Sequence, residues 1–140
     1  MYLADTIGAA FEIKSNINTK WQEAFSKIKE LKSLNRYSLE ENNYARLDDL
    51  TIPTYFIAFK GPKKISTIFN QLEAIGSRFS PDGIWIIESG VFYGRIPGGN
   101  TVYEVEDPQN AILAFTTVIY KVLNNYSKNQ PDLNRYHKLL

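Results

Sequence analysis

The chain has 140 residues, of which 44% are hydrophobic, and its 16 basic and 15 acidic side chains give a formal net charge of +1. This composition predicts one globular domain and excludes a disordered chain, while the near-neutral charge means that any contact with DNA must come from a local basic patch. With no cysteine and only one histidine, the sequence excludes disulfides, thiolate nucleophiles and multi-histidine metal sites.

The first third of the chain predicts a strand followed by a helix. Residues 6–14 form an apolar run that becomes polar only at its end, which is typical of a central strand buried on both faces. Capping residues follow at 16–18, and apolar side chains then recur at helical spacing. This helical stripe consists of Trp21, Ala24, Phe25, Ile28 and Leu31. The polar connection at 35–51 has a length that is typical of functional or mobile loops.

The rest of the chain predicts a second strand and helix, then three strands and a last helix. The second helix ends at Gly76, a favourable residue for a C-cap. Asp107 and Pro108 form the cap and the first position of the last helix. Turns rich in glycine separate the later strands. The predicted strands span residues 52–59, 84–87, 91–95 and 101–105.

The predicted order of elements is therefore β-α-β-α-β-β-β-α. Strands joined through a helix pair in parallel by right-handed crossovers, whereas strands joined by short turns pair antiparallel. The sequence thus predicts an α/β fold in which a mixed β-sheet is flanked by helices, with residues 1–140 forming one domain.

Glu12 and Lys14 are the main candidates for a catalytic pair. They are two positions apart on the first predicted strand, so both side chains leave the same face. The end of a strand before a helix is the usual place for a site in an open α/β sheet. A carboxylate there can bind Mg²⁺ or Mn²⁺, and a neighbouring ammonium can offset the charge that develops on a phosphate. The alternative is a solvated or salt-bridged pair at the edge of the sheet.

The segment at 9–17, Ala-Ala-Phe-Glu-Ile-Lys-Ser-Asn-Ile, resembles the E-x-K part of the PD-(D/E)XK, or restriction-endonuclease-like, superfamily. It is most similar to an uncharacterised bacterial branch of that superfamily, and the resemblance extends loosely through most of the chain. It implies a restriction-endonuclease-like core with a metal-dependent phosphodiesterase site. In that site Glu12 would be a metal ligand, Lys14 the catalytic lysine and Gln22 an accessory polar contact to the nucleic acid.

The superfamily pattern is incomplete in this sequence. Its other carboxylate, an aspartate on the preceding strand, should lie a dozen or more residues upstream, but only 11 residues precede Glu12. Asp5 could oppose Glu12 if the chain turned tightly at Gly8, and Glu88 could approach it if their strands were neighbours. Otherwise the chain is a minimal or N-terminally truncated version of the fold, or a second protein completes the site. Asp82 follows Pro81 and precedes Gly83, which is ordinary turn chemistry.

A cluster of lysines is the second candidate for contact with nucleic acid. Lys60, Lys63 and Lys64 lie close together after the second predicted strand. With Lys14 and Lys20 they would form a phosphate-facing patch. The alternative is a solvated loop without a ligand.

We therefore expect a nuclease-like domain that acts on or binds DNA, with Mg²⁺ or Mn²⁺ as its cofactor. The alternative is a non-catalytic protein- or DNA-binding module on the same fold, for example in mobile-element or phage-defence systems, and a homodimer fits either function. No segment reaches the roughly 20 apolar residues of a membrane span, and the N-terminus lacks the pattern of a secretory signal. We accordingly expect a cytoplasmic protein without membrane contact.

Overall fold

The computed structural model describes residues 7–34, 51–76 and 79–128. Within these ranges the elements follow one another in the predicted order and form an α/β fold. Asp5 and nearly all of the long polar connection predicted at 35–51 lie outside the described residues. The elements are β1 (Ala10–Asn16), α1 (Trp21–Lys32), β2 (Thr54–Lys60), α4 (Ile65–Ile75), β3 (Gly83–Ile86), β4 (Val91–Arg95), β5 (Val102–Glu106) and α5 (Pro108–Lys128).

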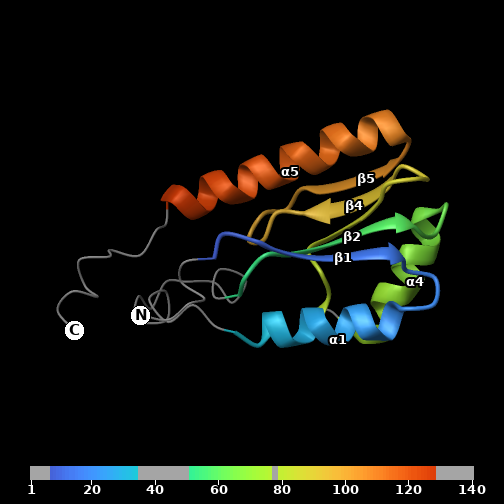
Figure 1. The fold of residues 1–140 in the computed structure, drawn as a ribbon. Coiled ribbons are helices and arrows are strands. Elements are labelled where there is room, and N and C mark those ends of the chain that lie inside the picture. The colour runs from blue at the N-terminus through green and yellow to red at the C-terminus, as the bar shows by residue number, and fades with distance from the viewer. Residues whose placement is uncertain (1–6, 35–50, 77–78, 129–140) are drawn as a thin grey trace.

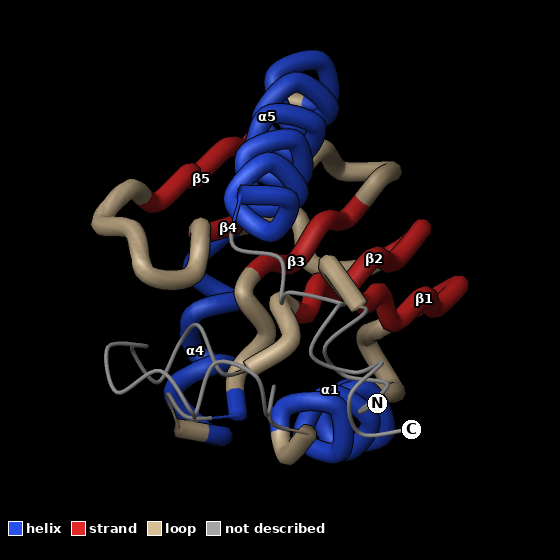
Figure 2. Tube along the Cα trace, turned by 90° about the vertical axis from the view of Figure 1, so that its left-hand side faces the viewer, coloured by secondary structure: helices blue, strands red, loops and turns tan. Residues whose placement is uncertain are grey.

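The strands form one five-stranded mixed sheet in the order β1-β2-β3-β4-β5. β1, β2 and β3 are parallel, whereas β4 is antiparallel to both β3 and β5. The connections through α1 and α4 step across the sheet in the same direction, so two right-handed crossovers place both helices on one face. α5 lies against the other face, and the result is a three-layered arrangement (Figures 1 and 2).

Two separate cores hold the layers together. Along β2, β3 and β4 alternate side chains enter opposite cores, as the twofold period of a strand requires. On β2, for example, Phe56 and Ala58 pack towards α1 and α4, while Tyr55 packs towards α5. Trp21 borders the first core and Trp85 borders the second, so each core has its own tryptophan.

β1 is an edge strand, and the prediction of a central strand was wrong. No other strand pairs with its outer side within the described ranges. Phe11 and Ile13 are 41% and 69% exposed, because α5 packs mainly over β4 and β5 (Figure 2). α5 reaches this face of β1 through Phe115, whose ring contacts that of Phe11 at 6.4 Å between centroids. β1 also continues to Asn16, so Glu12 and Lys14 lie inside the strand and not at its end.

α5 follows β5 directly and starts with a side-chain cap. The Asp107 carboxylate accepts a hydrogen bond of 2.9 Å from the backbone N–H of Asn110. In the described ranges no helix, α5 included, is long and apolar enough to cross a membrane. The outer side of α5 nevertheless carries large apolar side chains that are exposed. They are Ile112, Leu113, Tyr120 and Leu123.

Candidate functional site on strand β1

Glu12 and Lys14 form an ion pair on the face of β1 that is turned towards α1. Their β2 partners in the parallel register are Phe56 and Ala58, which belong to the core beneath α1 and α4. The Nζ atom of Lys14 lies 3.2 Å from Oε1 of Glu12. The two side chains are 15% and 21% exposed, so the pair is shielded but still open to water on one side.

Glu23, in the first turn of α1, is a second acidic partner of Lys14. Its Oε1 accepts a hydrogen bond of 2.5 Å from Lys14 Nζ. Glu23 lies outside the apolar stripe of the predicted helix, and the sequence pattern did not connect it with the strand. The sequence did contain one signal for this contact. Glu23 lies in the first turn of the helix that follows β1, and a crossover helix begins beside the end of the strand before it.

The two carboxylates keep Lys14 protonated. The hydrogen bond to Glu23, and then the one to Glu12, raise the pKa of Lys14 above its ordinary value of 10.5. In return, Lys14 lowers the pKa of Glu23 below 4.5, mainly through the same hydrogen bond. Lys14 is therefore a fixed positive charge near neutral pH and cannot serve as a general base. It can offset negative charge on a nearby phosphate.

Glu12 and Glu23 place two carboxylates beside Lys14. Carboxylate oxygens are the ligands that Mg²⁺ and Mn²⁺ prefer. Within the ranges that the structure describes, however, no group of three or more His, Cys, Asp or Glu side chains could hold a metal ion. The described residues thus supply two carboxylates, too few to hold a divalent cation by themselves, and Lys14 supplies the positive charge between them.

Glu88 does not join this cluster. It follows β3, and β2 lies between β3 and β1. The backbone N–H of Glu88 bonds to the carbonyl of Phe59, near the end of β2, whereas Glu12 pairs with Phe56. Glu88 is therefore displaced from Glu12 both across the sheet and along it.

The candidate contacts to nucleic acid gather where the parallel strands end. Ile17 connects two of them, since its N–H bonds to the carbonyl of Lys60 and its carbonyl accepts from the N–H of Lys20. Lys63 and Gln22 are also exposed. Lys64 differs from the others, because its Nζ lies 3.4 Å from Oε2 of Glu106 on β5.

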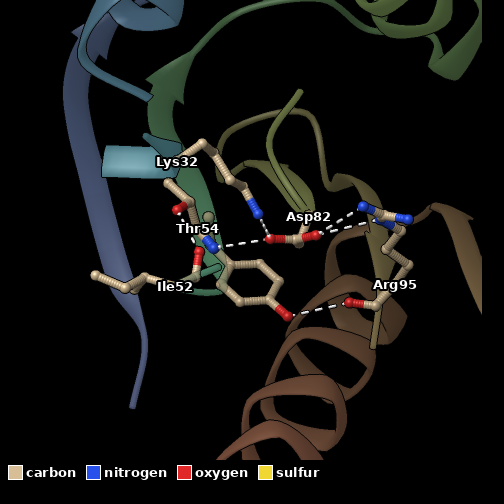
Figure 3. Close-up of polar contacts among 6 residues, drawn as sticks. Lys32, Ile52, Thr54, Asp82 and Arg95 are labelled. Atoms are coloured by element: carbon tan, nitrogen blue, oxygen red, sulfur yellow. Dashed lines mark hydrogen bonds and ion pairs between the residues drawn. The ribbon is translucent and has the colours of Figure 1, made fainter. Parts of the chain in front are cut away.

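Asp82 holds a buried polar network and does more than form the predicted turn (Figure 3). Its side chain is 1% exposed and that of Lys32, its ion-pair partner at the end of α1, is 3% exposed. Oδ2 also accepts the backbone N–H of Thr54 at 2.9 Å, and Oδ1 accepts Arg95 Nε at 3.2 Å. With its oxygens bonded to these groups, Asp82 is not the missing acid of the Glu12 site.

Tyr55 extends the Asp82 network towards α5. Its hydroxyl donates a hydrogen bond of 3.0 Å to the carbonyl of Arg95. Burial, and then the charge of Asp82, raise the pKa of Tyr55 far above its usual value. Tyr55 therefore remains a neutral hydrogen-bond donor, and the network serves to fasten α1, β2, β3 and β4 together.

Comparison with known proteins does not assign the chain to a family. No protein-family model matches it, and neither a curated protein nor a solved structure matches it significantly. Function therefore has to be inferred from the geometry of β1 and α1.

Proposed function

We propose that this chain is a nuclease-like domain, similar to the PD-(D/E)XK superfamily, that carries half of a metal-dependent phosphodiesterase site. The observation that carries the proposal is the meeting of Glu12, Lys14 and Glu23 on an edge strand. Carboxylates that bind a divalent cation and an ammonium that offsets phosphate charge are both used in metal-dependent phosphodiester cleavage. DNA is the proposed substrate.

Each side chain has a separate role in this proposal. Glu12 and Glu23 would hold Mg²⁺ or Mn²⁺, which when bound supplies positive charge beside the phosphate. Lys14 stays protonated and offsets the negative charge that develops on the phosphate oxygens. Lys20, Lys60 and Lys63 bind the flanking phosphates, with Gln22 as a further polar contact.

The site needs at least one more carboxylate, and the edge of β1 offers a place for it. A strand that pairs with this edge carries every second side chain on the α1 face, beside Glu12 and Lys14. We therefore propose that a protein partner completes the site by adding a strand to β1.

Cleavage of supercoiled plasmid and of single-stranded DNA in Mn²⁺ tests this function. Wild-type protein should cleave, and Glu12→Ala and Lys14→Ala should each lower the rate about a hundredfold or more. Glu104→Ala on β5 and Lys27→Ala on α1 are matched controls, because both side chains are exposed and neither belongs to the cluster. Equal activity of Glu12→Ala and wild type, or no cleavage by a folded protein at high concentration, would contradict the proposal.

A non-catalytic binding module is the second candidate function. It is favoured by the pairing of Lys14 with two carboxylates, which also suits a purely structural ion pair. It is favoured further by the exposed apolar side chains of β1, among them Ile13 at 69%. Absence of cleavage, together with a loss of stability in Lys14→Ala, would support this module over the enzyme.

A further inference from the structure

The outer edge of β1 offers a short row of backbone hydrogen-bonding groups. Ala10 N–H donates to the carbonyl of Pro53 beside β2. In a parallel ladder every second residue faces the same neighbour, so Glu12 and Lys14 also direct their backbone groups towards β2. Phe11 and Ile13 consequently direct their N–H and C=O groups outwards, whereas from Ser15 on the alternation shifts, because the N–H of Ile17 bonds to the carbonyl of Lys60 on β2. An added strand has to use Phe11 and Ile13.

We infer that a second copy of this chain occupies the edge, with the two β1 strands antiparallel and related by a twofold axis at Ile13. In this register the outward N–H and C=O groups of Ile13 bond to those of Ile13 in the copy. The side chains on the α1 face then match in charge. Glu12 lies directly opposite Lys14 of the copy, and Lys14 lies opposite its Glu12.

The neighbouring registers lack this complementarity. Shifting the axis by one residue towards the N-terminus places Glu12 opposite Glu12 of the copy. The opposite shift places Lys14 opposite Lys14. Like charges that face each other directly across a ladder are destabilising, so the charge pattern of β1 selects the register at Ile13.

Self-pairing is less favourable at β5, the other edge of the sheet. Glu104 lies in the middle of β5. Antiparallel pairing about Glu104 would place two glutamates face to face. β1 also carries the larger exposed apolar side chains, since Phe11 and Ile13 can be covered by their copies on the face that α5 covers only in part.

Self-pairing would identify the partner that completes the site. The two Glu12 side chains would lie diagonally across the ladder on one face, about 7–8 Å apart at Cβ, with both lysines between them. This consequence rests on the proposed phosphodiesterase function, whereas the pairing itself does not. A dimer without cleavage would leave the pairing standing, and cleavage by a monomer would refute the pairing alone.

Charge-reversal variants test the register by sedimentation equilibrium. Wild type should be a dimer, and Glu12→Lys and Lys14→Glu should each weaken the dimer about tenfold or more, because each replaces two attractive pairs by two repulsive ones. The double variant Glu12→Lys/Lys14→Glu restores opposite charges at both positions and should return dimerisation to within a few fold of wild type. Circular dichroism confirms folding. A double variant as weak as the single ones would overturn the register.

A cysteine cross-link tests the edge without altering the charges. The chain has no native cysteine, so Ile13→Cys introduces one thiol per copy, next to the twofold axis. A short bis-maleimide should join two copies of Ile13→Cys. It should leave Val102→Cys, on the opposite edge and 49% exposed, as single chains at the same protein concentration. Equal cross-linking of both variants, or a wild-type monomer at a concentration of several hundred micromolar, would refute the proposal.

Discussion

Replacement of Asp82 by alanine should be among the most destabilising single changes in this fold. The carboxylate accepts from the buried ammonium of Lys32, from the backbone N–H of Thr54 and from the Arg95 guanidinium. Loss of one partner of a buried ion pair leaves the other charge without compensation, which costs about 3–5 kcal/mol. Arg95 adds less to this cost, because its side chain is 32% exposed and water can solvate it.

This cost is large compared with the free energy of unfolding of a small domain, which is about 5–15 kcal/mol. We expect the midpoint of thermal unfolding to fall by roughly 10–20 °C. Replacing Lys32 by methionine in the Asp82→Ala background should recover part of the loss, because the buried ammonium that has lost the Asp82 carboxylate is then removed.

Urea unfolding followed by tryptophan fluorescence measures both effects, since Trp21 and Trp85 report on the two cores. Asp107→Ala is the matched control. It removes an exposed helix cap and should cost only about 1 kcal/mol. A loss below 1 kcal/mol in Asp82→Ala, or no recovery in the double variant, would refute this view of the network.

Three further predictions concern the acidic side chains and one turn. The N–H of Ile65, and then Lys64, lower the pKa of Glu106 below 4.5, so Glu106 stabilises the fold above that pH and loses its contribution as the pH falls through its folded pKa. The difference in unfolding free energy between wild type and Glu106→Gln should therefore shrink on acidification, and a constant difference would contradict this. Lys14→Met should raise the pKa of Glu23 towards 4.5 in a carboxyl NMR titration, and an unchanged titration would show that the hydrogen bond is not formed. Gly90→Ala should lower the free energy of unfolding in urea by about 2 kcal/mol or more, because Gly90 has a φ of +68° and a Cβ there would lie 2.1 Å from the nitrogen of Pro108. Gly76→Ala is the control. Gly76 has a φ of +78° but open space around it, so this change should cost less.

The sequence pattern predicted the order of elements because each helix has a clear apolar stripe and because the turns contain residues typical of turns, such as glycine, proline and aspartate. It did not distinguish an edge strand from a central one. The run at 6–14 is apolar enough for burial on both faces, yet Ile13 remains 69% exposed. The hydrophobicity of a strand indicates how much of it can be buried. The place of the strand in the sheet depends instead on the direction of both crossovers and on where α5 packs.

The candidate site was likewise predicted in part. Spacing alone placed Glu12 and Lys14 on one face, and the structure brings them within 3.2 Å. Glu23 was not predicted as a partner, because a contact between a strand and the following helix depends on how that helix docks. Asp82 was assigned to a turn, since the local Pro-Asp-Gly signal contains no information about Lys32, which lies 50 positions earlier.

Paramagnetic broadening by Mn²⁺ tests most directly whether β1 carries a metal site. In ¹⁵N-labelled protein, substoichiometric Mn²⁺ should broaden the amide signals of Glu12, Lys14 and Glu23 first, and Mg²⁺ should reverse the effect by competition. Glu12→Ala should abolish this local broadening while the rest of the spectrum stays the same. Broadening that begins elsewhere, or that persists at β1 in Glu12→Ala, would contradict the assignment of Glu12 as a metal ligand.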